Sequence, residues 1–311
     1  MAIFHLSAKL MGRSSGRSVV AAAAYRSGSR LVDERSGQVF DYTRKAVEHA
    51  EIIAPDRSPA WVYDRQQLWN RVEAVEKRKD AQLARELEIA LPRELTPEAR
   101  LELLRGFVRE HFTRRGMIAD CAVHCPKAAD GGAAPHAHIL LTLRPVEGDA
   151  FGKKAREWND VAQLEQWRAQ WAEAANAALE RAAVAARVDH RSLHAQRQEA
   201  LQLAREAGAV GRAGEADRHR RQAERLNRPP EPKLGSVRQL AERAGIALDR
   251  MTQWHRARGI RRVRERFAAL GHEGIRKLEE TIATQIAQEH RQRRGQSPQP
   301  PFRGPELSYE R

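Results

Sequence analysis

The sequence predicts an α+β fold, in which a largely antiparallel sheet has helices packed on one face and is followed by an α-helical C-terminal extension. Two observations lead to this prediction. In residues 1–150, short segments that alternate apolar and polar residues are interleaved with segments of helical periodicity, and a Gly-rich loop joins the last two alternating segments as in a hairpin. Beyond residue 158 the pattern is helical and rich in alanine.

The predicted strands share an apolar residue at every second position, which is the period of a strand with one buried face. They are residues 2–9, 85–91, 118–126 and 136–145, with a small additional hairpin over 31–42. In the last strand, Ile139 and Leu141 lie on the face opposite His136 and His138. The sheet therefore has one apolar face and one polar face.

The predicted helices alternate with these strands. They are residues 19–25, 59–83, 96–112 and 158–187. Ser18 can cap the first helix and Gly28 stops it, while Pro97 occupies the first position of the third. After them we expect an exposed helical or flexible linker over 196–232, a helical region over 233–290, and a disordered basic tail over 291–311.

Charge is distributed unevenly along the 311 residues. The chain has 55 Lys and Arg against 41 Asp and Glu, and of the net charge of +14, residues 1–150 contribute +3 and the remainder +11. A basic second half favours a polyanionic partner such as nucleic acid, although a solvated helical tail without a partner would have the same composition. No membrane-spanning stretch or secretory signal is apparent, and two cysteines fit a reducing compartment, so we expect a cytoplasmic protein.

Three histidines are expected to converge on the polar face of the predicted sheet. His136 and His138 lie at positions i and i+2 of one strand, and the hairpin lets His124 of the preceding strand face the same side. Three neutral imidazoles can bind one divalent ion. A simple solvated face is the alternative, but Glu86 and Glu88 also lie on this side of their strand, and such clusters of titratable groups are typical of a site.

The two cysteines do not fit a metal site, because the alternation directs Cys121 and Cys125 to the apolar face, where we expect small core residues. Tyr25 follows four alanines and precedes small, polar and basic residues. A lone helical tyrosine is most often a packing residue, but these neighbours offer it little apolar surface.

Four segments together are similar to the plasmid mobilisation relaxases of the MobA/MobL family, which belong to the HUH endonucleases. They are MAIFHLSAK at the N-terminus, GRSSGRSVVAAAAYRSG, ELEIALPREL and PHAHILLT. The resemblance covers residues 1–195, including VDHRSL near its end. It implies a relaxase domain over this range, with an HUH relaxase-like fold, that nicks one DNA strand at a plasmid transfer origin and so initiates conjugative mobilisation.

The resemblance also implies roles for individual residues. Tyr25 would be the nucleophile that forms a 5′-phosphotyrosyl intermediate. Glu86 or Glu88 would assist it, either as a base or by hydrogen bonding to the metal ligands. The implied metal ligands are His124, His136 and His138, and the residues expected to contact DNA are Arg26, Arg30 and Lys9. The expected cofactor is a divalent metal ion, Mg²⁺ or Mn²⁺.

The expected partner is single-stranded DNA at the transfer origin, with accessory mobilisation proteins and a coupling protein as further candidates. Two other functions stay open on the residues alone. One is a metal-dependent nuclease that uses water, with Tyr25 merely structural. The other is a non-catalytic DNA-binding accessory protein, for which the basic second half alone would suffice.

Overall fold

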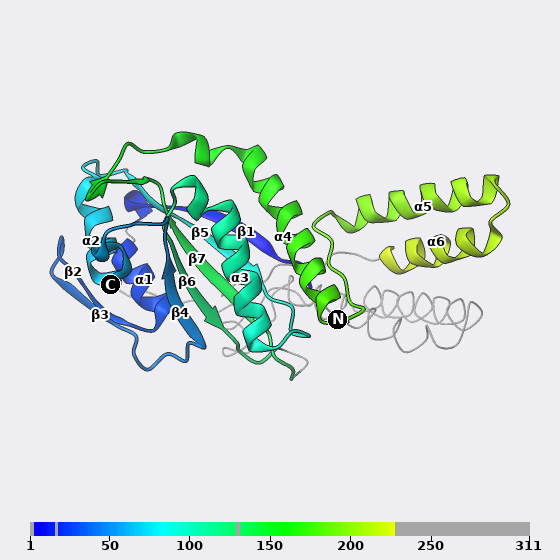
Figure 1. Ribbon diagram of the computed structural model, residues 1–311, viewed down its shortest axis with the longest axis horizontal. Helices are drawn as coiled ribbons and strands as arrows, with labels where there is room; N and C mark the ends of the chain where they lie inside the picture. Colours follow the sequence, from blue (N-terminus) through cyan, green and yellow to red (C-terminus); the bar gives the residue numbers. More distant parts are fainter. Residues whose placement is uncertain (1–2, 16–17, 129–130, 228–311) are drawn as a thin grey trace, which may run out of the picture. The chain divides into compact units, whose positions relative to one another are not determined.

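The computed structural model describes residues 3–15, 18–128 and 131–227 (Figure 1). The chain divides between His190 and Arg191 into two compact units, which are described one at a time. The helical region expected over 233–290 and the tail expected over 291–311 lie outside the described residues.

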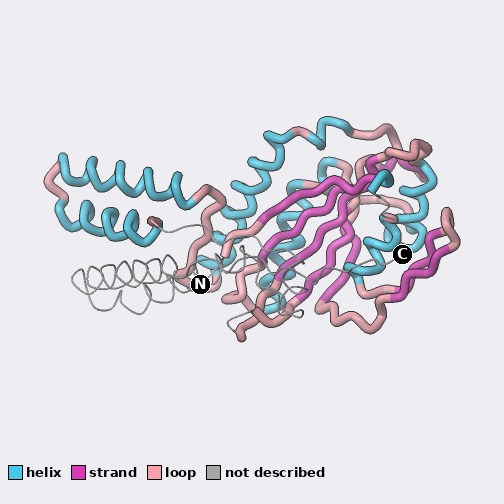
Figure 2. The backbone as a smooth tube through the Cα atoms, turned by 180° about the vertical axis from the view of Figure 1, so that it is seen from behind, coloured by secondary structure: helices cyan, strands magenta, loops and turns pink. Residues whose placement is uncertain are grey.

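The first unit is built on a five-stranded sheet in the order β1-β5-β7-β6-β4, with every neighbouring pair antiparallel. The strands of this sheet lie side by side in magenta in Figure 2. The strands are β1 (Leu6–Gly12), β4 (His49–Ile53), β5 (Gln82–Ala90), β6 (Ala119–His124) and β7 (His136–Thr142). Two separate hairpins accompany this sheet and consist of β2 (Arg30–Asp33) with β3 (Gln38–Asp41) and β8 (Val146–Glu147) with β9 (Ala150–Phe151). The predicted antiparallel sheet is confirmed.

The predicted helices on one face of the sheet are also confirmed. Helices α3 (Pro97–His111) and α4 (Val161–Arg181) pack against the apolar side chains of the central strands, among them Ile139 and Leu141. Phe107 of α3 meets Trp171 of α4 edge to face at 5.0 Å between ring centroids, a favoured geometry for aromatic pairs. This face of the sheet forms the larger of the two hydrophobic cores.

The opposite face is covered in part as well, which the sequence pattern did not reveal. Helices α1 (Val19–Ser27) and α2 (Arg65–Val75) form a second core with residues from the sheet such as Ala84 and Leu140. The alanines at the centre of α1 are buried and allow it to approach the sheet closely. The far end of the same face, where the histidines lie, stays partly open.

Several predicted boundaries need correction. The helix expected over 59–83 is a short 3₁₀ turn (Ala60–Tyr63) followed by α2, and Leu83 already belongs to β5. Asp64 starts α2 because its carboxylate accepts a hydrogen bond from the backbone N–H of Gln67 at 3.1 Å. The helix expected over 158–187 is α4 preceded by a 3₁₀ turn (Arg156–Asn159). Strand β4 was not predicted.

In the described part of the second unit, residues 191–227, two helices form a hairpin. They are α5 (Leu193–Ala209) and α6 (Ala213–Leu226), and α5 begins three residues before the stretch 196–232 for which a helical or flexible linker was expected. Their mutual contact is made by alanines such as Ala204 and Ala223, whose small side chains permit close approach of the helices. None of the helices in the described ranges carries an apolar stretch of the length needed to cross a membrane.

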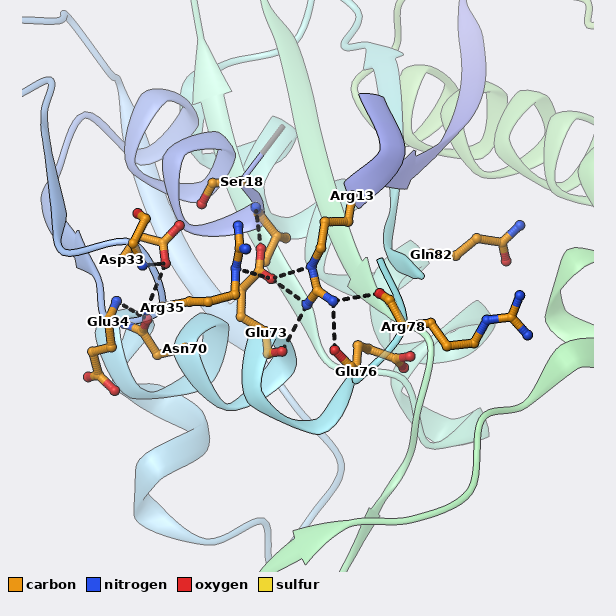
Figure 3. Close-up of polar contacts among 12 residues, drawn as sticks. Arg13, Ser18, Asp33, Glu34, Arg35, Asn70, Glu73, Glu76, Arg78 and Gln82 are labelled. Carbon is orange, nitrogen blue, oxygen red and sulfur yellow. Dashed lines mark hydrogen bonds and ion pairs between the residues drawn. The ribbon is translucent and has the colours of Figure 1, made fainter. Parts of the chain in front are cut away.

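A buried carboxylate fixes the start of α1 (Figure 3). Glu73 of α2 is 2% exposed, and its Oε1 accepts the backbone N–H of Val19 at 3.2 Å. Its Oε2 pairs with Arg13 at 2.7 Å and with Arg35 at 3.4 Å. A negative charge at a helix N-terminus is favourable, and this one also joins the end of β1 to α2.

We expect Glu73→Ala to lower the free energy of unfolding by about 3 kcal/mol, because it leaves the Arg13 guanidinium without its buried counter-charge. Urea denaturation followed by circular dichroism measures the change. The matched control is Glu34→Ala, since that glutamate is exposed, and its change should stay within about 0.5 kcal/mol. Equal effects of the two substitutions would contradict an anchoring role for Glu73.

Candidate active site

Three histidines from two adjacent strands converge on one point of the partly open face. His124 ends β6, His136 begins β7, and these two residues are directly opposite each other in the ladder, with His138 two residues further along. One ring nitrogen of each lies within 4.8 Å of the others, and the ring centroids are 5.1–5.4 Å apart. The arrangement predicted from the strand alternation is therefore present.

Each of these rings already uses one nitrogen as a hydrogen-bond donor. His124 Nε2 lies 2.7 Å from the carbonyl oxygen of Arg26, His136 Nδ1 lies 3.0 Å from that of Ala134, and His138 Nδ1 lies 3.2 Å from Oε1 of Glu86. Carbonyl and carboxylate oxygens can only accept, so these nitrogens carry the protons. In a neutral ring the second nitrogen has a lone pair that can bind a metal ion, and metal-binding histidines usually donate their other N–H in this way.

The protonation state of the rings also suits a cation. Burial lowers the pKa of His124 to about 4, with a further contribution from the positive charge of Lys45. Burial lowers the pKa of His136 as well. These two rings are therefore neutral at physiological pH, and neutral ligands would leave the full charge of a divalent ion in place.

Glu86 connects the histidines to α1. Its Oε1 accepts from Arg26 Nε at 3.0 Å and lies 2.6 Å from Arg26 Nη2, on the same oxygen that meets His138. Burial alone would raise the pKa of the Glu86 carboxyl, but the hydrogen bonds from His138 and Arg26 outweigh it and lower the pKa to about 2. A carboxylate this acidic is a poor proton acceptor, so its position favours orientation of His138.

The structure separates the two candidate glutamates. Glu88 follows on the same side of β5, but its side chain is 37% exposed and lies 3.9 Å from His5 Nε2. Glu86 is buried and bonded to His138 and Arg26, whereas Glu88, although opposite His138 in the ladder, is partly exposed and lies near His5. Of the two carboxylates, Glu86 is therefore the one integrated into the site.

Tyr25 lies in the last turn of α1 and is 50% exposed. Its ring and that of Tyr42 form a T-shaped contact at 5.2 Å between centroids. The next residue along the helix is Arg26, whose carbonyl oxygen accepts from His124. The helix end that carries the tyrosine is thus bonded directly to one of the three histidines.

The three predicted DNA-contacting residues have different surroundings. The Arg26 guanidinium is held by Glu86 and by the carbonyl oxygen of Ala22, and its side chain is 15% exposed. Arg30 begins β2 with a 58% exposed side chain, 4.0 Å from Asp41. Lys9 is exposed on β1, opposite Glu86 in the ladder. Arg30 and Lys9 are available to a ligand, while Arg26 is part of the internal network.

Sequence reasoning missed two residues of this site, and it misplaced a cysteine that lies outside the site. Lys45 and Tyr42 both contact Tyr25, but they belong to an irregular segment between β3 and β4 with no periodicity to reveal them. Cys121 is buried as predicted, whereas Cys125 is exposed and not a core residue. The alternation used for Cys125 fails because β6 ends one residue earlier, at His124.

Comparison with known proteins identifies the class. The sequence profile of the MobA/MobL family matches residues 17–213, and the chain belongs to this family. It is 43% identical over 261 residues to the mobilization protein MobL of Acidithiobacillus ferridurans, an alignment that covers 72% of this chain and 68% of MobL.

Two further relatives extend the comparison. The chain is 36% identical over 284 residues to the conjugal transfer protein TraA of Agrobacterium fabrum, covering 80% of this chain but only 25% of TraA. A solved structure described as the molecular basis of vancomycin resistance transfer in Staphylococcus aureus is 33% identical, with a TM-score of 0.57. That alignment covers 61% of this chain and all of the solved chain, so the similarity extends to the fold.

The lowered histidine pKa predicts a pH dependence of stability for the metal-free protein. Between about pH 6.5 and about pH 4, the unfolded chain binds a proton at His124 that the folded chain rejects, so the free energy of unfolding should fall by about 2–3 kcal/mol as the pH falls. Glu86 extends the loss below about pH 4.5. Urea titrations in chelator across this range measure it. His124→Gln should remove most of the decrease between about pH 6.5 and about pH 4. A wild-type free energy of unfolding that does not change over this range would contradict a buried neutral ring at His124.

Proposed function

We propose that the protein is a DNA relaxase that nicks one strand at a plasmid transfer origin by attack of a tyrosine on the scissile phosphate. The observation that carries this proposal is the bond between the carbonyl oxygen of Arg26 and His124, because it joins the helix end bearing an exposed tyrosine to three convergent histidines. Membership of the MobA/MobL family supports the same activity.

In the proposed reaction the Tyr25 oxygen attacks the phosphorus of the scissile phosphodiester, and the bond from phosphorus to the 3′-oxygen breaks. The products are a 5′-phosphotyrosyl link and a free 3′-hydroxyl: the phenolic proton passes to solvent or to a nearby base, and the leaving 3′-oxygen takes up a proton from solvent. The number of phosphoester bonds is unchanged, so the strand can be resealed by the reverse attack. This property suits a protein that must restore the DNA after transfer.

His124, His136 and His138 would hold the divalent ion, with Mg²⁺ and Mn²⁺ as the candidates, and Glu86 would orient His138 behind it. The bound ion would supply charge to offset the phosphate and its developing negative charge. Arg26 fixes the Glu86 carboxylate through their ion pair, which supports a positioning role in place of a DNA contact.

Single-stranded DNA is the proposed substrate, and the exposed Arg30 and Lys9 are proposed to contact its phosphates. Residues 1–195 would form the relaxase domain, and the basic extension beyond them would bind DNA, an accessory mobilisation protein or a coupling protein. The proposed location is the cytoplasm, where plasmid DNA is accessible.

We expect Tyr25→Phe to abolish the covalent DNA adduct while changing affinity for an origin-containing single strand by less than about threefold, because only the attacking oxygen is lost. Denaturing electrophoresis of a labelled oligonucleotide detects the adduct, and fluorescence anisotropy measures the affinity. Tyr63→Phe is a matched control, since that tyrosine is 52% exposed on another element, and its adduct yield should equal wild type. Strand cleavage without an adduct in the wild type would indicate a water-using nuclease.

We expect His138→Ala to weaken Mn²⁺ binding by more than about 100-fold. Loss of a residue that only hydrogen-bonds to a metal ligand commonly costs about 10–100-fold in affinity, and loss of a ligand itself should cost more. Isothermal titration calorimetry in the absence of DNA measures this without reference to catalysis. His194→Ala removes an exposed histidine of α5 and should bind Mn²⁺ like wild type. Undiminished binding by His138→Ala would rule out the three-histidine centre.

A further inference from the structure

The segment between β3 and β4 is folded against the end of α1. Gly28 terminates the helix with φ +66°, and a Cβ at this position would lie 2.8 Å from Cγ2 of Val47 and 3.2 Å from the carbonyl oxygen of Lys45. On its other side, the backbone N–H of Glu48 donates to the carbonyl oxygen of Val123 at 2.9 Å. The segment is therefore fixed between α1 and β6, close to His124.

This placement brings the Lys45 side chain over the Tyr25 ring. Lys45 Nζ lies 3.6 Å from the ring centroid and donates a hydrogen bond to the carbonyl oxygen of Tyr25 at 2.9 Å. That carbonyl is in the last turn of α1, where backbone acceptors lack helical partners. Together with the T-shaped contact to Tyr42, the Lys45 contact gives the Tyr25 ring contacts with two side chains.

Within the described residues, no carboxylate forms an ion pair with the ammonium group of Lys45. The buried carboxylate of Glu86 is already engaged by Arg26 and His138. Burial and the positive charge of Arg26 lower the pKa of Lys45 to about 8, so the group is still mainly charged at neutral pH. Its charge is available to an anion that forms on, or binds beside, the tyrosine.

We propose that Lys45 is the positioning residue of the nucleophile. Its hydrogen bond to the backbone carbonyl oxygen of Tyr25 and its cation–π contact hold the ring in place, and its charge offsets negative charge on that ring during attack. The inference rests on the proposed role of Tyr25. A cation over a ring face is attracted by the ring's electron density, and the attraction grows when the ring is a phenolate. Lys45 acts through Tyr25 and is distinct from the metal ligands.

The test compares three variants under single-turnover conditions with saturating single-stranded oligonucleotide and Mn²⁺. Lys45→Met preserves most of the side-chain volume but removes the charge, and it should slow adduct formation about tenfold, as expected for the loss of one partly desolvated cation–π contact. Lys45→Arg restores the charge and should recover the rate to within about threefold. Arg44→Met removes the same charge from the exposed neighbouring residue and should leave the rate unchanged.

A DNA-binding measurement distinguishes a positioning role from a merely structural one, because a structural defect would also weaken binding. In a Tyr25→Phe background, Lys45→Met should change affinity for the same strand by less than about threefold, so that the loss falls on the rate and not on binding. Far-UV circular dichroism and urea denaturation confirm that each variant is folded. A Lys45→Met rate equal to wild type, or a Lys45→Arg rate as slow as Lys45→Met, would overturn the inference.

Failure of the proposed function would appear differently, as a wild-type protein that forms no adduct at all. The contact itself has an independent measurement. The ε-methylene resonances of Lys45, lying over the ring, should be shifted upfield in the NMR spectrum of wild type and return to ordinary values in Tyr25→Leu. Identical Lys45 resonances in both proteins would contradict the contact whatever the activity.

Discussion

The carboxylate of Glu86 is the charge on which the arrangement of the site depends. One of its oxygens meets Arg26 from α1 and His138 from β7, so three elements that are distant in sequence share a single acceptor. A buried carboxylate is costly unless it is paired, and here both partners would also be costly to leave alone. The three groups therefore stabilise one another, and the position of α1 relative to the histidines follows from that.

The same helix is fixed at its other end by a second buried carboxylate. Glu73 accepts the first backbone N–H of α1, while at the far end the carbonyl oxygens of Tyr25 and Arg26 accept from Lys45 and His124. Helix termini carry unsatisfied groups that must find partners, and in α1 those partners come from the sheet, from α2 and from an adjoining segment. The backbone groups at the ends of α1 need hydrogen-bond partners, and the bonds that supply them hold the tyrosine close to the histidines.

Much of the sheet and the histidine cluster could be predicted because both depend on local alternation. The i, i+2 spacing of His136 and His138, with a hairpin back to His124, is sufficient to place them on one face. Strand β4 could not be predicted, since its partly buried residues show no clean alternation and it is defined by pairing with β6. The helix break at Asp64 depends on a capping hydrogen bond, which periodicity does not record.

Lys45 was beyond sequence reasoning for the same physical reason. Its importance comes from contacts between irregular chain and a helix end, and these depend on tertiary packing. Gly28 makes that packing possible, because a residue with a side chain would push the segment carrying Lys45 away from the end of α1. Any L-amino acid there would strain the backbone and collide with Val47. Position 28 should therefore tolerate no substitution, although glycine has no side chain that could take part in a reaction.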